Sequence, residues 1–509
     1  MAVETLATRR WAVAVIALAC LTSPATAEFD NPKAKVPPAA KPQRRSGAEG
    51  LPPLPLPATP LRRTERKRQP APPALVGMIT LSSGQFAVID GRHQPVGNFP
   101  TTQIDIERLM SYANAQLKIQ YRYMPVSLDS FSWDPSELPL LYLTGWTALP
   151  PLSDDLVAKL QRYLLDGGTL VIHAQCGREE FITSARREIA RILPNRPLAA
   201  VDTDSPLFHA AVEVDRMRVR KDADDFRALP PYIEAVYLGC RPALIFSPID
   251  LNCGWDVVNR PIEGGILYHQ DDALKLGLNV IAVTLADFQY ARSWGTQTIF
   301  HQQDDPSRDQ LLIGQIVHSG DWDPTPHGLA NLMKYLHQET TLQVQFKREL
   351  VDLADADAFR HPVLYMTGLR DFVLSDVQVQ RLRAFLTAGG VLLADSAAGN
   401  KAFDVAFRRE IARVLPDSPL AVLPPDCPIY QVPHTITAVE YTPIVQAQAG
   451  HVTAPLLEGI TLDGQLAVIY SPLGLSNGWE QLPYAYNRGY ADTDALRLGV
   501  NILTYALTH

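Results

Sequence analysis

The residues of this chain best suited to chemistry follow apolar stretches that are predicted to be buried strands. Cys176 comes two positions after the stretch Thr169–Ala174, on a sharp turn into the next helix. Backbone amides at a helix N-terminus can activate such a thiol as a nucleophile. Cys176 is therefore a candidate nucleophile for a thiol hydrolase. A structural turn cysteine is the favoured alternative, because Ala398 stands at the matching position of a second, similar segment.

Three acidic residues form the second candidate group. Asp321 and Asp323 flank Trp322, and Asp395 ends another apolar stretch. Three converging carboxylates could bind a cation or perform acid–base catalysis. In the favoured alternative, one of the first two acids caps the following helix and Trp322 packs in the core, because the first half of the chain keeps neither acid.

The remaining candidates are polar or aromatic residues expected near the carboxyl ends of strands, where open parallel sheets bind ligands. With Trp322, they are His173, Gln175, Arg178, Trp255, Asp256, Asn400, Trp479 and Glu480. The sequence contains no Cys-x-x-Cys or His-Glu-x-x-His spacing and no phosphate-binding glycine loop. No metal and no cofactor are therefore expected.

The elements that must position these residues occur twice. At a constant offset of 222 positions, 18 of the 40 residues from Leu160 to Ala199 match those from Leu382 to Ala421. This internal duplication fixes the domain count. We expect a first repeat over residues 75–292 and a second over 293–509.

Within each repeat, short apolar strands alternate with amphipathic helices. Leu140–Gly145 matches Val363–Gly368, and Gln85–Asp90 and Leu311–Val317 are the expected opening strands. Strands that alternate with helices predict a parallel sheet covered on both faces. The fold class is thus α/β, with two tandem flavodoxin-like three-layer domains built on parallel sheets.

The N-terminal residues have the composition of an export signal followed by a tether. Arg9 and Arg10 precede an apolar run and the small residues Ala25-Thr26-Ala27, which predicts a signal peptide over 1–27, cleaved after Ala27. The mature protein is then expected in the periplasm or outside the cell. Residues 28–74 are rich in proline, lysine and arginine, as in a disordered linker.

Charge separates this linker from the rest of the chain. Residues 1–74 carry 12 basic and 5 acidic groups, whereas the whole chain has a net charge of −8. The basic linker could contact an anionic surface, although a solvated spacer is the simpler interpretation. The acidic body argues against nucleic acid as a partner.

Four cysteines remain after the predicted cleavage: Cys176, Cys240, Cys253 and Cys427. Cys240 and Cys253 are separated by 13 positions, a spacing that suits a disulfide across a hairpin. Free buried thiols are an equally good interpretation.

The second repeat contains the motifs Gly320–Pro324, Leu364–Gly368, Asp426–Tyr430, Gly478–Glu480 and Leu498–Asn501. Together they resemble a bacterial family, domain of unknown function 4159. The resemblance implies a class I glutamine-amidotransferase-like fold. Where the family has Asp-His-Pro, this chain has Asp204-Ser-Pro206 and Asp426-Cys-Pro428, so both copies lack that histidine.

The leading expectation is an exported, non-catalytic tandem protein that binds a partner protein or glycan in the cell envelope. The alternative is a hydrolase that acts on a sugar or amide, with the three acids or Cys176 at its centre.

Overall fold

The structure is a computed structural model. It describes residues 71–79, 85–89, 92–96, 105–126, 131–194, 196–221, 225–256, 265–294, 311–340, 344, 348–355, 360–481 and 484–508. Residues Pro73–His509 form one compact unit that contains both repeats. The predicted signal peptide and almost all of the predicted linker lie outside the described residues.

The first repeat is built on a seven-stranded sheet in the order β4-β1-β5-β6-β11-β10-β7. The strands, in that order, are Arg122–Val126, Ala74–Ile79, Leu140–Gly145, Thr169–Ala174, Arg241–Ser247, Glu234–Leu238 and Ala199–Ala200. The first five are parallel, and β10 pairs antiparallel with both β11 and β7. Numbered along the chain, the parallel strands have the order 2-1-3-4-5 of flavodoxin-like folds.

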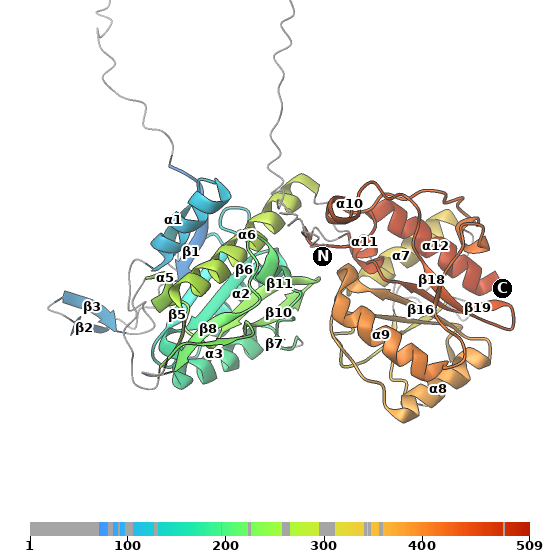
Figure 1. Ribbon diagram of the computed structural model, residues 1–509, viewed down its shortest axis with the longest axis horizontal. Helices are drawn as coiled ribbons and strands as arrows, with labels where there is room; N and C mark the ends of the chain where they lie inside the picture. The colour runs from blue at the N-terminus through green and yellow to red at the C-terminus, as the bar shows by residue number, and fades with distance from the viewer. Residues whose placement is uncertain are drawn as a thin grey trace, which may run out of the picture. The chain divides into compact units, whose positions relative to one another are not determined.

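Helices cover both faces of this sheet (Figure 1). The helical segments are α1 (Asp105–Leu117), α2 (Asp154–Leu165), η1 (Gln175–Gly177), α3 (Glu179–Ile192), α4 (Pro206–His209), α5 (Asn252–Trp255) and α6 (Gln270–Trp294). Tyr142 packs in one apolar core with α1 and α6, whereas its neighbour Leu143 packs in a second core with α2 and α3. This alternation is expected of a strand that is buried on both faces. The result is a three-layer domain.

The second repeat has the same topology, in the order β14-β13-β15-β16-β19-β18-β17. These strands are Glu349–Val351, Ile313–Ile316, Val363–Gly368, Val391–Ser396, Gln465–Ser471, Glu458–Leu462 and Ala421–Val422. Its helical segments are α7 (Gly328–Glu339), α8 (Asp376–Thr387), η3 (Ala397–Gly399), α9 (Lys401–Val414), η4 (Pro428–Tyr430), α10 (Pro443–Ala449), α11 (Ser476–Glu480) and α12 (Asp492–Thr508). Helices α7 and α12 pack on one face of the sheet, and α8 and α9 on the other (Figure 1). The strand-for-strand match confirms the duplication.

Two smaller sheets complete the first repeat. The strands β12 (Ile266–Tyr268), β8 (Met217–Lys221) and β9 (Arg227–Leu229) form one of them. The strands β2 (Gln85–Ile89) and β3 (Arg92–Val96) pair antiparallel as the other. The prediction that Gln85–Asp90 opens the main sheet is therefore wrong. The opening strand is β1, whose apolar residues directly follow the proline-rich segment, and the predicted linker includes its first residue, Ala74.

The predicted parallel sheets are confirmed, and each sheet also carries an antiparallel hairpin. The hairpin β10–β11 turns through Gly239 and Cys240, with φ of 56° and 70°. The hairpin β18–β19 turns through Asp463 and Gly464, with φ of 48° and 85°. Two-residue loops of this kind can join only antiparallel strands, because a parallel connection needs a long crossover. Each sheet is mostly parallel with an antiparallel edge.

Other predictions were closer. The strands Leu140–Gly145, Val363–Gly368 and Thr169–Ala174 are confirmed to the residue. None of the helices in the described part of the chain is long and apolar enough to cross a membrane.

Candidate functional site

Cys176 lies on a tight turn between β6 and α3. Its backbone has φ 53° and ψ 18°, a left-handed conformation that is rare outside glycine, and Gly177 follows with φ 61°. Only 1% of the Cys176 side chain is exposed. A side chain on Gly177 would collide with Ile266 Cγ2 at 2.1 Å, so β12 packs directly over the turn. The thiol is thus in the predicted place, but it is covered.

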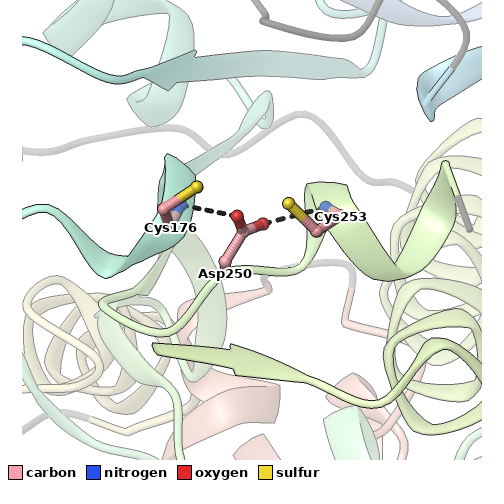
Figure 2. Close-up of side chains that lie close together, drawn as sticks. All are labelled: Cys176, Asp250 and Cys253. Carbon is pink, nitrogen blue, oxygen red and sulfur yellow. Dashed lines mark hydrogen bonds between the residues drawn. The ribbon is translucent and has the colours of Figure 1, made fainter. Parts of the chain in front are cut away.

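Two further residues meet Cys176 at this turn. Figure 2 shows the side chains of Cys176 and Cys253 on either side of the Asp250 carboxylate. Asp250 Oδ2 accepts the Cys176 N–H at 2.5 Å, and its Oδ1 accepts the Cys253 N–H at 3.0 Å. The two sulfurs and a carboxylate oxygen lie within 4.8 Å of one another, and all three residues are buried. We call these residues the thiol–carboxylate cluster.

The second repeat builds the same turn without this cluster. Ala398 takes the position of Cys176 with φ 52°, and its N–H donates to Asn477 Oδ1 at 2.5 Å. Asn477 corresponds to Cys253, and Gly474 to Asp250. A side chain on Gly474 would lie 2.8 Å from the Ala398 nitrogen. The turn therefore needs one hydrogen-bond acceptor for its left-handed residue, and the two repeats supply it from different positions.

Behind this turn, the first repeat buries a chain of polar side chains. The Tyr142 hydroxyl donates to Asp105 Oδ2 at 2.9 Å and lies 2.6 Å from His173 Nε2. Asn252 also donates to Asp105. Burial raises the pKa of Asp105 to about 6 and lowers the pKa of His173 to about 4. At neutral pH, an uncharged imidazole thus shares the Tyr142 hydroxyl with a carboxylate.

In the second repeat, Asp395 occupies the position of His173 and binds the matching tyrosine. Its Oδ1 accepts the Tyr365 hydroxyl at 2.8 Å. Its Oδ2 accepts the N–H of Leu475 at 3.0 Å, the N–H of Ser476 at 2.9 Å and the Ser476 hydroxyl at 2.8 Å. Asp395 is fully buried, and burial raises its pKa. The Asp395 carboxylate was expected at an open strand end, but its oxygens are already hydrogen-bonded to these donors inside the fold.

The other two acids of the predicted group are bound by arginines. Arg348 donates to both carboxylate oxygens of Asp323, at 2.5 and 2.9 Å. Arg196, from the first repeat, lies 3.6 Å from Asp321 Oδ1 and 3.8 Å from Asp323 Oδ2. Burial raises the pKa of Asp321. Among the described residues, the ligand atoms of Asp321, Asp323 and Asp395 do not converge on one point.

The tip of the hairpin β10–β11 reaches the turn of the second repeat. Asn477 Nδ2 donates to Cys240 Sγ at 3.1 Å. Cys240 packs in a small apolar cluster with Leu369, Ala397, Ala398 and Tyr484. The position that corresponds to the Cys176 turn is therefore covered by the first repeat.

The predicted tryptophans have matching contacts in both repeats, whereas their acidic neighbours contact different residues. Trp255 Nε1 donates to Ala273 O and Trp479 Nε1 to Ala495 O, both at 2.8 Å. Glu480 accepts the backbone N–H of His327 at 2.7 Å and lies 2.9 Å from its Nδ1. At the other turn, Asp256 lies 3.7 Å from Arg108 Nη1.

Of the remaining predicted residues, Gln175 and Arg178 lie at the first turn and Asn400 at the second. Asn400 caps α9 by accepting the Ala402 N–H at 2.9 Å. Gln175 is buried at the start of η1, and the Arg178 guanidinium stacks 4.4 Å from the Trp146 ring centre. The Trp322 ring lies 5.5 Å from the Arg348 guanidinium.

Sequence reasoning did not name Asp105 as a site residue, and it did not pair Asp250 or Cys253 with Cys176. Asp250 lies 74 positions after Cys176, so no local motif joins them. A position-by-position comparison of the repeats was the available signal, because Cys176, Asp250 and Cys253 all differ from Ala398, Gly474 and Asn477. The four described cysteines are free, and the Cys253 thiol interacts with that of Cys176.

Comparisons with known proteins add one informative match. A search of curated proteins finds no significant match. Among solved structures, the crystal structure of a "putative phosphosugar isomerase" from Silicibacter pomeroyi DSS-3 aligns with 63% of this chain and 75% of that chain, at 10% identity and a TM-score of 0.16. The family model for domain of unknown function 4159 matches residues 100–285 and again 312–507. The chain therefore belongs to the family of domain of unknown function 4159 and carries two copies of that domain.

Proposed function

We propose that this protein is an exported, non-catalytic module that binds a partner protein or glycan in the cell envelope. Its domains are proposed to be class I glutamine-amidotransferase-like. The observation that carries the proposal is that the groups best suited to catalysis are already used inside the fold. Asp395 is fully buried and accepts four hydrogen bonds, and Cys176 lies under β12.

Contacts between the repeats support the same proposal. Cys240 packs on Ala398, and Arg196 lies beside Asp321 and Asp323. A group that ends in an ion pair or under a packed hairpin has little freedom to reach a substrate. The function is therefore assigned to surfaces outside the strand ends, and the duplication supplies two such surfaces in one chain.

Export is part of the proposal. It rests on Arg9 and Arg10, the apolar run after them and the small residues Ala25-Thr26-Ala27. The basic segment 28–74 would then lie between the point of processing and the acidic body, where it could reach an anionic envelope surface.

Thiol accessibility tests the non-catalytic assignment. The folded chain is treated with iodoacetamide near pH 6, and labelling of each cysteine is followed by mass spectrometry, with the unfolded chain as the reference. Cys427, which is partly exposed, serves as the internal control. We expect Cys176 to label far more slowly than Cys427. Rapid labelling of Cys176 alone would contradict the proposal.

Partner capture tests the binding assignment. The mature chain is used to capture proteins and glycans from intact envelope after cross-linking, and the same chain unfolded by heat is the control. We expect a partner that is retained by the folded chain and by its Cys176→Ala variant. A partner lost in Cys176→Ala would instead place binding at the turn.

One observation favours the hydrolase alternative. Cys176 has φ 53° on a strand-to-helix turn, the strained placement that presents a nucleophile in several hydrolase folds. Ala398 keeps the same conformation with φ 52° and has no nucleophilic atom. The conformation therefore belongs to the turn in both repeats and does not by itself indicate catalysis.

A further inference from the structure

We propose that Cys176, Asp250 and Cys253 form a binding site for a thiophilic divalent cation of the zinc type in the first repeat. The proposal does not depend on the envelope function above, because it concerns a buried cluster and not an outer surface.

The donor set is the first argument. Two cysteine sulfurs and one carboxylate oxygen are ligands that Zn²⁺ accepts, whereas Mg²⁺ and Ca²⁺ prefer oxygen alone. The three ligand atoms lie within 4.8 Å of one another. Ligand atoms around a tetrahedral zinc ion are separated by about 3.8 Å. The ligand atoms therefore need to approach by at most about 1 Å to reach this spacing.

The second argument is that the fold already holds the three residues close together. Cys176 and Cys253 come from η1 and α5, and Asp250 lies in the loop before α5, so separate segments supply the ligands. Asp250 already accepts the backbone N–H of each cysteine, which fixes all three residues relative to one another. Such bonds to a carboxylate ligand are typical of metal sites, because they orient the ligand before the ion arrives.

The second repeat provides an internal comparison. It makes the same left-handed turn with Ala398, Gly474 and Asn477, of which only Asn477 has a polar side chain. The turn therefore does not require two thiols and a carboxylate. In the first repeat, Asp250 alone supplies the acceptor for the Cys176 N–H, so the Cys253 thiol is not needed for that purpose. The turn can therefore form without the thiol–carboxylate cluster. All three residues of the cluster have side chains that can bind a metal ion.

Binding has a defined proton balance. Each thiol loses its proton when its sulfur joins the ion, so binding weakens as the pH falls. Among the described His, Cys, Asp and Glu residues, no fourth joins the cluster. A water molecule or a small ligand would complete a tetrahedral site.

The test uses the mature chain, reduced and stripped with a chelator. Zn²⁺ or Co²⁺ is added, free ion is removed by gel filtration, and the retained metal is measured against protein. We expect about one ion per chain, together with a thiolate-to-cobalt charge-transfer band in the near ultraviolet. We also expect bound Zn²⁺ to protect Cys176 and Cys253, but not Cys427, from alkylation in partly denaturing buffer.

The second repeat also supplies the variants. Cys176→Ala, and Asp250→Gly combined with Cys253→Asn, reproduce residues with which the second repeat folds, and both should lose the ion. Cys427→Ala should retain it. His209→Ala is the second control, because His209, Glu213 and Asp215 form the other converging group among the described residues.

Two results would overturn the proposal. The reduced wild-type chain could retain no Co²⁺ or Zn²⁺, or Cys176→Ala could retain as much as the wild type. In the second case, loss of the ion in His209→Ala would place it at the other group. The alkylation pattern is read on the wild type alone, so an unstable variant would not remove the test.

Discussion

The hydroxyl of Tyr142 lies 2.6 Å from Nε2 of His173, and the same hydroxyl donates to Asp105. In the second repeat, Tyr365 donates to Asp395, which stands at the position of His173. Gly328 stands where the first repeat has Asp105. The carboxylate that binds the buried tyrosine thus comes from helix α1 in the first repeat and from strand β16 in the second. The requirement common to both is a partner for a buried hydroxyl.

This difference predicts unequal costs for the same mutation in the two repeats. Tyr142→Phe removes the hydroxyl partner of His173 Nε2 and one hydrogen bond of Asp105, which keeps those from Asn252 and the Ile106 N–H. We expect a loss of about 1–3 kcal/mol in the free energy of unfolding. Tyr365→Phe should cost less, because Asp395 keeps three other hydrogen bonds. Urea unfolding of both variants measures the difference. Equal losses of stability would mean that the contacts of Tyr142 with Asp105 and His173 contribute no more than the single hydrogen bond of Tyr365.

His318 predicts a loss of stability in acid. Its Nδ1 accepts the Gly320 N–H at 3.0 Å and its Nε2 lies 2.8 Å from Thr367 O, so both nitrogens are used by the neutral ring. Burial lowers the pKa of His318 from 6.5 to about 4. Between these values the unfolded chain binds more protons than the folded chain, so this contribution to stability is lost as the pH falls from about 6.5 to 4.

The matched variant is His318→Gln, which cannot take up a proton in this range. We expect the stability of the wild type to fall more steeply with acid than that of His318→Gln, measured by urea unfolding at several pH values from 7.5 to about 4. Other titrating groups contribute to both proteins and cancel in the difference. If the two proteins lost stability with acid at the same rate, the pKa of His318 would not be lowered in the folded state.

Much of the fold could be predicted from the sequence, because central strands such as Leu140–Gly145 are short, mostly apolar runs that are buried at every position. The opening strand was misplaced for a physical reason. Gln85–Ile89 has the apolar and β-branched composition of a strand, but it pairs with Arg92–Val96 in a hairpin of its own. Whether a strand joins the main sheet or a separate hairpin depends on pairing partners that can be far apart in the chain. The composition of the strand does not identify these partners.

The candidate site was predicted only in part, for a similar reason. Cys176 could be found because it lies on a local strand-turn-helix pattern. Its partner Asp250 is 74 positions away, and the arginine that binds Asp321 comes from the other repeat. Local spacing predicts which residues reach a strand end. It does not predict which packed elements cover them.

Truncation of the N-terminus tests the boundary between linker and body. The strand β1 (Ala74–Ile79) lies between β4 and β5 in the sheet, so its removal would separate these two strands. We expect a chain that begins at residue 71 to melt at the same temperature as the mature chain. A chain that begins at residue 80 should lose the cooperative unfolding of the first repeat. A lower melting temperature for the first truncation would mean that the basic linker packs on the body.

A buried glutamate that recurs in both repeats supplies the last prediction. Glu188 is 1% exposed; its carboxylate accepts from Arg187 Nε at 2.7 Å, Arg191 Nη1 at 2.6 Å and the Leu152 N–H at 3.2 Å. It therefore ties α3 to the start of α2. Glu410 makes the corresponding contact with the Leu374 N–H, also at 3.2 Å.

Removal of one partner from a buried ionic group costs about 3–5 kcal/mol, because the charges left behind lose their compensation. The arginines here are partly exposed, so we expect Glu188→Ala to cost less, about 2–3 kcal/mol. Glu188→Gln should cost less again, since the amide oxygen still accepts the Leu152 N–H. Glu410→Ala, as the matched variant, should fall within about 1 kcal/mol of Glu188→Ala, because the two networks share their geometry. Urea unfolding measures the stability of all three variants. If Glu188→Ala left the free energy of unfolding unchanged, packing of the helices alone would fix α3 against α2.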